Sequence, residues 1–180
     1  MTQRTSDKTL NGTMAPLADD SCGSIYGEFH AVIFRADGSI EDKGWKRNIV
    51  TKLGLNRIAN RAVNDASSKA GFLAIGTATA AASLNAAVTS FGEVGRKIST
   101  VLTTAAQSRE WFFMVATWGG AADGLTGVVL DSAVITDHVN SGLGQPWNIV
   151  NGLAVTLQGS DVLNLTARIR VGSHDIDHTA

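Results

Sequence analysis

An amphipathic segment in the first third of the chain limits what the sequence can fold into more than any other feature. Its apolar residues recur at helical spacing and form one stripe: Leu55, Ile58, Ala59, Ala62 and Val63. The sequence therefore predicts a helix at about 51–64, with Thr51 capping its start and Gly54 in its first turn. A helix of this length with one apolar stripe is not stable alone in water, so it needs a sheet or another subunit to lie on.

Most of the remaining sequence has the composition of β-strands. Segment 24–36 carries apolar residues on both alternating faces, and so does the aromatic segment 109–118, REWFFMVATW. A strand that is apolar on both faces is central in a packed structure or faces another subunit. The charged segment 39–49 is typical of a solvated edge strand, and Asp37-Gly38 predicts a type I′ hairpin turn that joins it to 24–36.

The closing segments alternate strictly, and their pattern predicts a hairpin. Leu157 is expected opposite Leu163, because this register places the apolar residues of both strands on one face. The turn is then a three-residue loop of Gly159, Ser160 and Asp161.

Counted together, these patterns predict about seven to nine strands and one helix. Further strands are expected at 72–77, 96–104 and 127–139, with a bend near Asp131-Ser132, and small-residue loops at 78–89 and 140–147. We expect a mainly β fold, an antiparallel β-sandwich that is jelly-roll-like, with the helix packed on it. The chain divides into an extended N-terminal arm (1–23), the sandwich domain (24–172) and a C-terminal tail (173–180).

Composition favours association with other protein. Of the 180 residues, 44% are hydrophobic and 17% are charged, so we expect part of the surface to be covered, as in a homo-oligomer. The alternative is a soluble monomer whose surface is rich in Ser, Thr and Asn. The formal net charge is −1, which lacks the basic excess typical of nucleic-acid-binding proteins, so no specific nucleic acid partner is expected.

Targeting and redox signals are weak in this sequence. The N-terminal residues lack the apolar stretch of a signal peptide, and no long apolar run indicates a membrane span. We therefore expect a soluble protein made in the cytoplasm, without membrane contact. Cys22 is the one cysteine, which excludes an internal disulfide and is more typical of a small packed residue than of a nucleophile.

Candidate chemical groups are scattered along the chain. The densest set of potential metal ligands lies in the tail: His174, Asp175, Asp177 and His178. Their spacing matches no strong metal motif, and ordering a tail costs free energy, so we interpret them as a solvated tail or a neighbour contact and expect no metal and no cofactor.

Neither a hydrolytic triad nor a carboxylate pair is indicated. His30 and His138 could act as bases, and Glu28, Glu93 and Glu110 could act as acids, but no G-x-S-x-G motif occurs and spacing alone brings no two carboxylates together. We therefore expect no catalytic residues.

Two groups of charged residues suggest contacts instead. Arg168 and Arg170 share the polar face of the last strand, where they could meet acidic groups of a partner or a phosphate backbone, with Lys97 nearby. The alternative is an ordinary solvated face. Glu93 and Arg96 are three residues apart and are expected to pair with each other or to brace the helix.

Several short motifs resemble a family of virion proteins from tailed bacteriophages. These motifs are Asn48-Ile49-Val50-Thr51 before the helix, Gly54-Leu55 within it, Ala74-Ile75-Gly76-Thr77 at the end of a strand, and Glu93 shortly before Arg96. The resemblance covers about residues 27–171, including the closing segment LNLTARIRV. It implies a structural role in the virion, as a capsid decoration or cement protein or a tail or neck accessory. It brings no catalytic residues.

The expected partners are copies of this chain and other virion proteins, such as the major capsid or tail proteins. The expected interface residues are Leu10, Met14, Leu17, Trp111, Phe112, Phe113, Met114, Trp118 and Trp147, and the expected structural residues are Thr51, Gly54, Gly76, Glu93 and Arg96. One alternative is a tail-fibre or head-surface module that binds host glycans, with Trp118 and Trp147 as stacking faces. Another is a hydrolase of cell-wall or capsule sugar.

Overall fold

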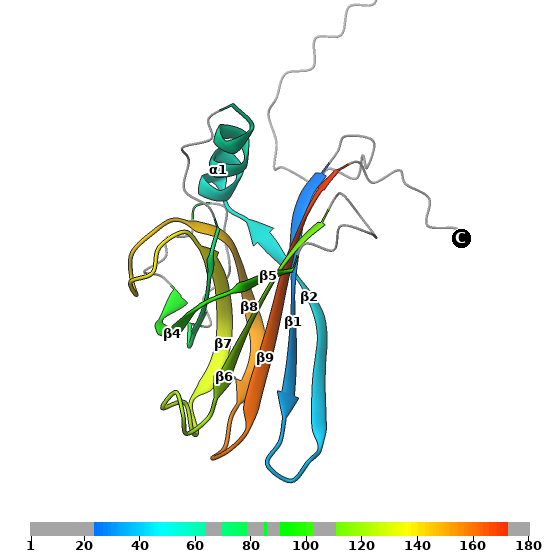
Figure 1. The fold of residues 1–180 in the computed structure, drawn as a ribbon, viewed down its shortest axis with the longest axis vertical. Coiled ribbons are helices and arrows are strands. Elements are labelled where there is room, and N and C mark those ends of the chain that lie inside the picture. The colour runs from blue at the N-terminus through cyan, green and yellow to red at the C-terminus, as the bar shows by residue number, and fades with distance from the viewer. Residues whose placement is uncertain (1–23, 64–69, 79–84, 86–90, 103–110, 173–180) are drawn as a thin grey trace, which may run out of the picture.

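A computed structural model of the chain shows a β-rich fold with a single helix among the residues it describes (Figure 1). These residues are 24–63, 70–78, 85, 91–102 and 111–172. The helix is α1 (Lys52–Val63), and the strands are β1 (Ser24–Phe34), β2 (Ile40–Val50), β3 (Phe72–Gly76), β4 (Glu93–Ile98), β5 (Thr100–Leu102), β6 (Trp111–Gly119), β7 (Val129–Thr136), β8 (Pro146–Thr156) and β9 (Val162–Gly172).

The described strands form one antiparallel sheet that curls nearly into a barrel. Its order is β4-β3-β7-β8-β2-β1-β9-β6-β5. β4 and β5 stand at opposite ends of this order, yet only Ser99 separates them in the sequence, so the chain itself connects the two ends of the sheet. The expectation of a mainly β, antiparallel fold with one helix is confirmed.

The barrel interior is built by alternation along the strands. On β1, Phe29, Ala31 and Ile33 are buried, while the residues between them are partly exposed. Every second residue of β9 from Leu163 to Ile169 is also buried, in the same core as residues of β7 and β8. Because side chains of a strand alternate between two faces, one face of each strand lines the core and the other faces outward.

One junction of the sheet is held by few backbone contacts. β2 pairs with β8 only at Ile49↔Ile149 and Val50↔Asn148. Farther along, the Lys46 ammonium donates a hydrogen bond to the Gly152 carbonyl and bridges the two strands. The rest of β2 is paired with β1. Because β2 stands between β8 and β1 in the sheet, it is not the edge strand that its charged sequence predicted.

The predicted pairing of the last two strands is wrong. β8 lies between β7 and β2, whereas β9 lies between β1 and β6, so Leu157 does not face Leu163 across a hairpin. The connection instead crosses from one side of the barrel to the other, with a hydrogen bond from the Asp161 N–H to the Gln158 carbonyl. Both strands still turn their apolar residues into the same core. The alternating pattern therefore indicated correctly which residues face inward.

Two local turns also refine the sequence predictions. Gly38 has a positive φ of 86°, but Asp37 does not, so the β1–β2 turn is not type I′. The Gly38 N–H instead donates to the Arg35 carbonyl, in a turn with one left-handed residue. The bend predicted near Asp131 is present as a shift in the β7–β8 register between Leu130 and Ser132.

Helix α1 is seated directly on the backbone of β8. The Thr51 hydroxyl accepts a hydrogen bond from the Gly54 N–H (2.9 Å), which is the predicted N-terminal cap. Gly54 is buried, and a Cβ at this position would lie 2.0 Å from the Trp147 carbonyl oxygen. Leu55 and Ile58 are half-buried and Ile58 packs on the core, whereas Ala59 is exposed. The helix therefore lies on the sheet, as its stripe requires.

Replacing Gly54 by alanine should destabilise the fold. The new Cβ would overlap the Trp147 backbone and cost about 3 kcal/mol, at the upper end for overpacking. The better helix propensity of alanine returns only about 1 kcal/mol, so we expect a net loss of about 2 kcal/mol in the free energy of unfolding. Urea denaturation followed by circular dichroism would measure it.

The matched control is Asn56→Ala, an exposed change in the same helix that should leave stability unchanged or slightly raised. If Gly54→Ala behaved like this control, the close seating of α1 on Trp147 would be wrong.

Candidate interaction surface

The outward face of strands β2, β1, β9 and β6 is the broadest candidate for a functional surface. Cross-strand register fixes which residues share this face. Glu28 is paired with Arg47 on one side and Arg168 on the other, and Phe113 follows beyond Arg168. The next outward row runs from Trp45 through His30 and Thr166 to Val115. We call these two rows the outer sheet face: Arg47, Glu28, Arg168, Phe113, Trp45, His30, Thr166 and Val115.

Trp45 is the centre of the outer sheet face. The Arg168 guanidinium carbon lies 3.9 Å from the centroid of its indole ring, and the His30 ring stacks on it at 4.8 Å with an interplanar angle of 23°. Glu28 Oε2 accepts a hydrogen bond from Arg168 Nε (2.7 Å), and Asp42 Oδ1 lies 2.6 Å from His30 Nε2. These contacts fix the indole ring, and Trp45 as a residue stays 40% exposed.

The carboxyl group of Asp42 is held in its ionised form. The backbone N–H of Gly44 donates to it at 2.7 Å, and the His30 ring adds a second interaction. Both lower the pKa of Asp42 below its usual value. The edge of the face beside Trp45 therefore keeps a negative charge at neutral pH.

The described part of the chain leaves this face without a covering layer. The main contacts of β1, β9 and β6 are with their sheet neighbours and with strands across the barrel interior. The helix contacts β8, and Figure 1 shows it above β7 and β8, away from the β1–β2 hairpin. Phe113 and Val115, on β6, are half-buried.

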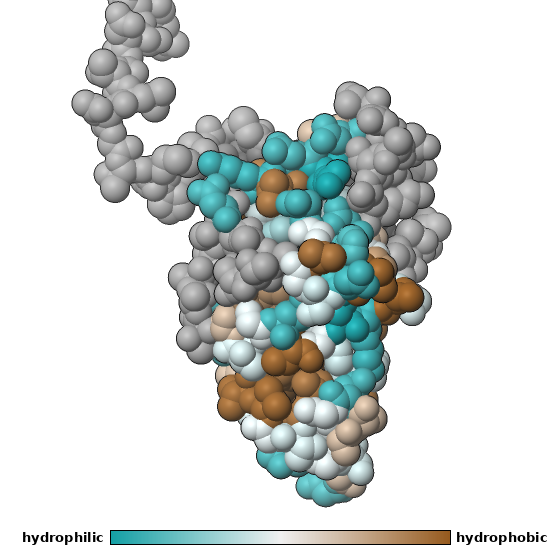
Figure 2. All heavy atoms as spheres, turned by 90° about the vertical axis from the view of Figure 1, so that its left-hand side faces the viewer, coloured by the Kyte–Doolittle hydropathy of each residue, from teal (hydrophilic) through white to brown (hydrophobic). Residues whose placement is uncertain are grey.

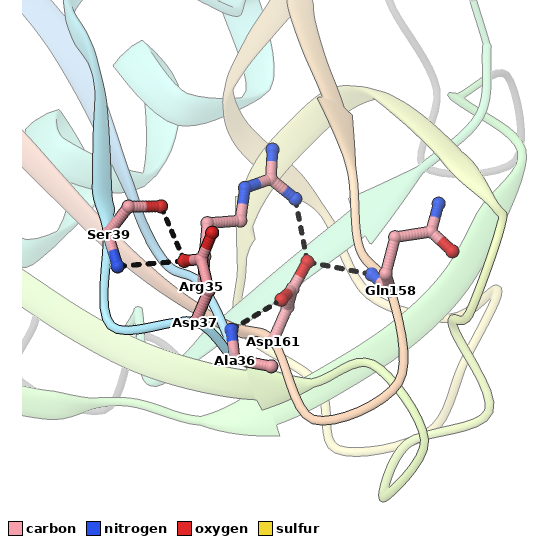
Figure 3. Close-up of a pocket in the computed structure, with 6 residues that line it drawn as sticks. All are labelled: Arg35, Ala36, Asp37, Ser39, Gln158 and Asp161. Carbon is pink, nitrogen blue, oxygen red and sulfur yellow. Dashed lines mark hydrogen bonds and ion pairs between the residues drawn. The ribbon is translucent and has the colours of Figure 1, made fainter.

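A polar depression lies at the hairpin end of the barrel (Figure 3). It has a volume of about 370 Å³ and is lined by Arg35, Ala36, Asp37, Ser39, Gln158 and Asp161. The buried Asp161 carboxylate accepts hydrogen bonds from Arg35 Nη1 (2.7 Å) and from the backbone N–H groups of Ala36 and Gln158 (both 2.9 Å). Arg35 also donates to the Thr156 carbonyl and to Glu41.

These bonds join the β1–β2 turn to the β8–β9 connection. The Arg35 hydrogen bond, followed by the two backbone donors, lowers the pKa of Asp161 below its usual value of 3.8. Arg35 and Asp161 are therefore engaged with each other, and Asp37 accepts hydrogen bonds from the N–H and the hydroxyl of Ser39, so the arrangement is that of a structural lock.

A buried ion pair holds a loop on the opposite side of the barrel. Arg96 and Glu93 form two hydrogen bonds of 2.7 Å, and both side chains are almost fully buried. Arg96 Nη1 also donates to the carbonyl oxygens of His138, Asn140 and Leu143. The pair therefore forms, and it braces the loop after β7, not the helix.

Apolar side chains are exposed around the Arg96–Glu93 pair. Val94 and Ile98 flank Arg96 two residues away on β4, and Val139 and Leu143 belong to the loop itself. Figure 2, which views the molecule from the left-hand side of Figure 1, shows hydrophobic residues in separate patches among hydrophilic ones. Gly76, at the end of β3, packs nearby against Phe91, whose carbonyl oxygen would lie 2.1 Å from a Cβ.

The remaining candidate chemical residues are engaged in local contacts or lie outside the described residues. His138 Nδ1 accepts a hydrogen bond from the Asn140 N–H, and Lys97 pairs with Asp123, not with the arginines of β9. Glu110 and the ligands expected in the 173–180 tail lie outside the described residues. In the part of the chain that is described, no group of three or more His, Cys, Asp or Glu is placed to hold a metal ion.

Three of the expected interface residues are in the chain's own core. Met114 and Trp118 are 1% exposed and Trp147 is 5% exposed, so their assignment to an interface is wrong, and the two tryptophans cannot be stacking faces for a glycan. β6 is apolar on both faces, and its sequence did not show which face turns inward. Phe113 does lie on the outer sheet face.

The other expected interface residues are not tested by the structure. The backbone of Trp111 and Phe112 belongs to β6, but their side chains lie outside the description, as do Leu10, Met14 and Leu17. Sequence reasoning overlooked Trp45, because the charges around it dominated the interpretation of its strand. Trp45 could have been recognised from its position opposite His30 in the β1–β2 hairpin, which places both rings on one face.

Comparison with known proteins assigns this chain to no family. No family model, no curated protein and no solved structure matches the chain. Among the described residues, no helix is long and apolar enough to cross a membrane.

The Asp161 lock should give the fold a pH-dependent stability. A carboxyl whose pKa is lowered by folding stabilises the protein above its unfolded value, near 4, and this contribution is lost as the pH falls through the folded value. We expect Asp161→Asn to lower the urea midpoint at pH 7, and we expect the difference from wild type to shrink as the pH falls to 3.

The control is Gln158→Ala, which removes an exposed side chain but keeps the backbone N–H that Asp161 binds. It should follow wild type at both pH values. A difference for Asp161→Asn that stayed constant from pH 7 to pH 3 would contradict the lowered pKa.

Proposed function

We propose that this chain is a non-enzymatic structural protein of a tailed-phage virion, a capsid decoration or cement protein or a tail or neck accessory. It acts by burying surface against copies of itself and other virion proteins. The short motifs around Thr51, Gly54, Gly76 and Arg96 support the virion assignment by resemblance. The finer expectation of a jelly-roll-like sandwich stays a prediction.

The observation that carries the proposal is the outer sheet face. It combines a partly exposed indole with half-buried Phe113 and Val115, across four adjacent strands and without a covering layer in the described residues. Its apolar side chains stand at the two ends of the rows, Trp45 on β2 and Val115 and Phe113 on β6, with polar and charged side chains between them. Exposed apolar residues bordered by polar ones are typical of sites of protein contact. Aromatic residues and arginine, which are both present here, are enriched where proteins bind one another.

The ionisable residues support a structural role over a catalytic one. Glu28 is engaged by Arg168, Glu93 by Arg96, and Asp161 by Arg35. The first and third pairs join separate strands or loops, and Arg96 also holds the loop after β7 through three carbonyl oxygens. This is the use expected of charges that organise a scaffold.

Association through the outer sheet face can be tested by sedimentation velocity over a range of concentrations. We expect wild type to form oligomers and Val115→Lys to weaken association about tenfold or more, because a lysine there must be desolvated against the partner. The control is Val129→Lys, the same change at an exposed position on β7, which should associate as wild type does.

Thermal unfolding of both variants would confirm that they remain folded. A wild-type chain that stays monomeric at high concentration, alone and with virion proteins, would contradict the proposal.

Trp45 keeps a glycan-binding module as the second candidate. Its indole is held in place and partly exposed, and aromatic rings of this kind also stack on sugars. On a glycan array, this alternative predicts binding by wild type that is lost in Trp45→Ala. Binding should be retained in Ile40→Ala, an exposed change on the same strand. A flat array for wild type would reject this alternative.

A further inference from the structure

The N-terminal arm matches the outer sheet face in chemistry. Its apolar residues near the domain are Met14 and Leu17, and the acidic pair Asp19-Asp20 follows them. Pro16 favours a polyproline II conformation, which repeats every three residues with a rise of about 3.1 Å per residue. In that conformation Met14, Leu17 and Asp20 project on one side, about 9 Å apart, which is the width of about two strand spacings.

The outer sheet face offers sites at this spacing. Arg47 on β2 and Arg168 on β9 lie two strands apart, with Glu28 between them on β1. Arg168 is ion-paired with Glu28, so Arg47 is the cationic side chain of this row that an acidic segment would meet. An arm that crosses the strands with Asp20 at Arg47 brings Leu17 over β9, between the indole of Trp45 and the side chain of Val115.

Chain length favours the arm of a second molecule. Asp20 lies four residues before Ser24, a separation that spans at most about 14 Å. Glu28, which is paired with Arg47, lies four residues after Ser24, about 13 Å along β1. An arm that folded back on its own face would need its whole extended length and would have none left for the turn. A neighbouring copy has no such limit.

We propose that residues 14–20 of one copy bind the outer sheet face of another copy, with Asp20 at Arg47 and Leu17 between Trp45 and Val115. This inference rests on the proposed function and names the contact through which copies associate. The exchange of arms links molecules without requiring any change in the barrel.

Cysteine cross-linking between two variants tests the contact. One variant carries Leu17→Cys and the other Val115→Cys, each with Cys22→Ser to remove the one natural cysteine. Mild oxidation of the mixture should give a disulfide-linked dimer on a non-reducing gel, well above the level of either variant oxidised separately. Replacing Val115→Cys by Val129→Cys, on an exposed part of β7, should abolish that dimer.

Charge reversal tests the predicted ion pair. We expect Asp20→Arg in the first variant, or Arg47→Glu in the second, to lower the dimer yield about fivefold or more, because like charges would then face each other. Both changes together should restore most of the yield. Arg47 is exposed, so its replacement should leave the fold intact.

Several outcomes would overturn the inference. The first is a dimer yield no higher than that of the Val129→Cys control, and the second is a failure of the two charge changes to restore the yield. The third comes from one chain that carries both Leu17→Cys and Val115→Cys: a disulfide that forms only within that chain and never between two chains. If one of them occurred while Val115→Lys still disrupted association in sedimentation, the arm contact would be wrong and the proposed function would stand.

Discussion

The structure depends on a single interior that strands from both sides of the sheet must fill together. β1 and β9 contribute Phe29, Ile33 and the alternate residues of the last strand, and β7 and β8 close over them from the opposite side. Burial of apolar area contributes about 25 cal/mol per Å², which makes this shared interior the dominant stabilising term. The curvature of the sheet and the crossing between β8 and β9 both follow from the need to enclose it.

Polar groups are concentrated where that interior ends. Asp161 and Arg35 join the connections at the hairpin end, and the Thr51 cap begins the helix that lies on β8. Each of these groups has several partners, which offsets the cost of removing a charged or polar group from water. The outer sheet face is different, because its charges surround an aromatic ring that stays partly exposed.

Local patterns in the sequence predicted the helix, its cap and the short strand β3, since each is decided by neighbouring residues. They could not predict which strands become neighbours. The alternation of β8 and β9 showed correctly which residues turn inward, but an inward set can be buried by a strand across the barrel as well as by one beside it. For β6 the ambiguity went deeper: with Trp118 on one face and Phe113 on the other, only the folded chain shows which is inside.

Arg96 has a consequence that reaches beyond its ion pair. One of its guanidinium nitrogens is surrounded by three main-chain carbonyl oxygens, while Glu93 balances the charge. The side chain therefore serves these carbonyl oxygens with a cation that is covalently tethered to the neighbouring strand. The loop after β7 is therefore held by a positive charge that the polypeptide itself supplies, with Glu93 as its built-in counter-ion.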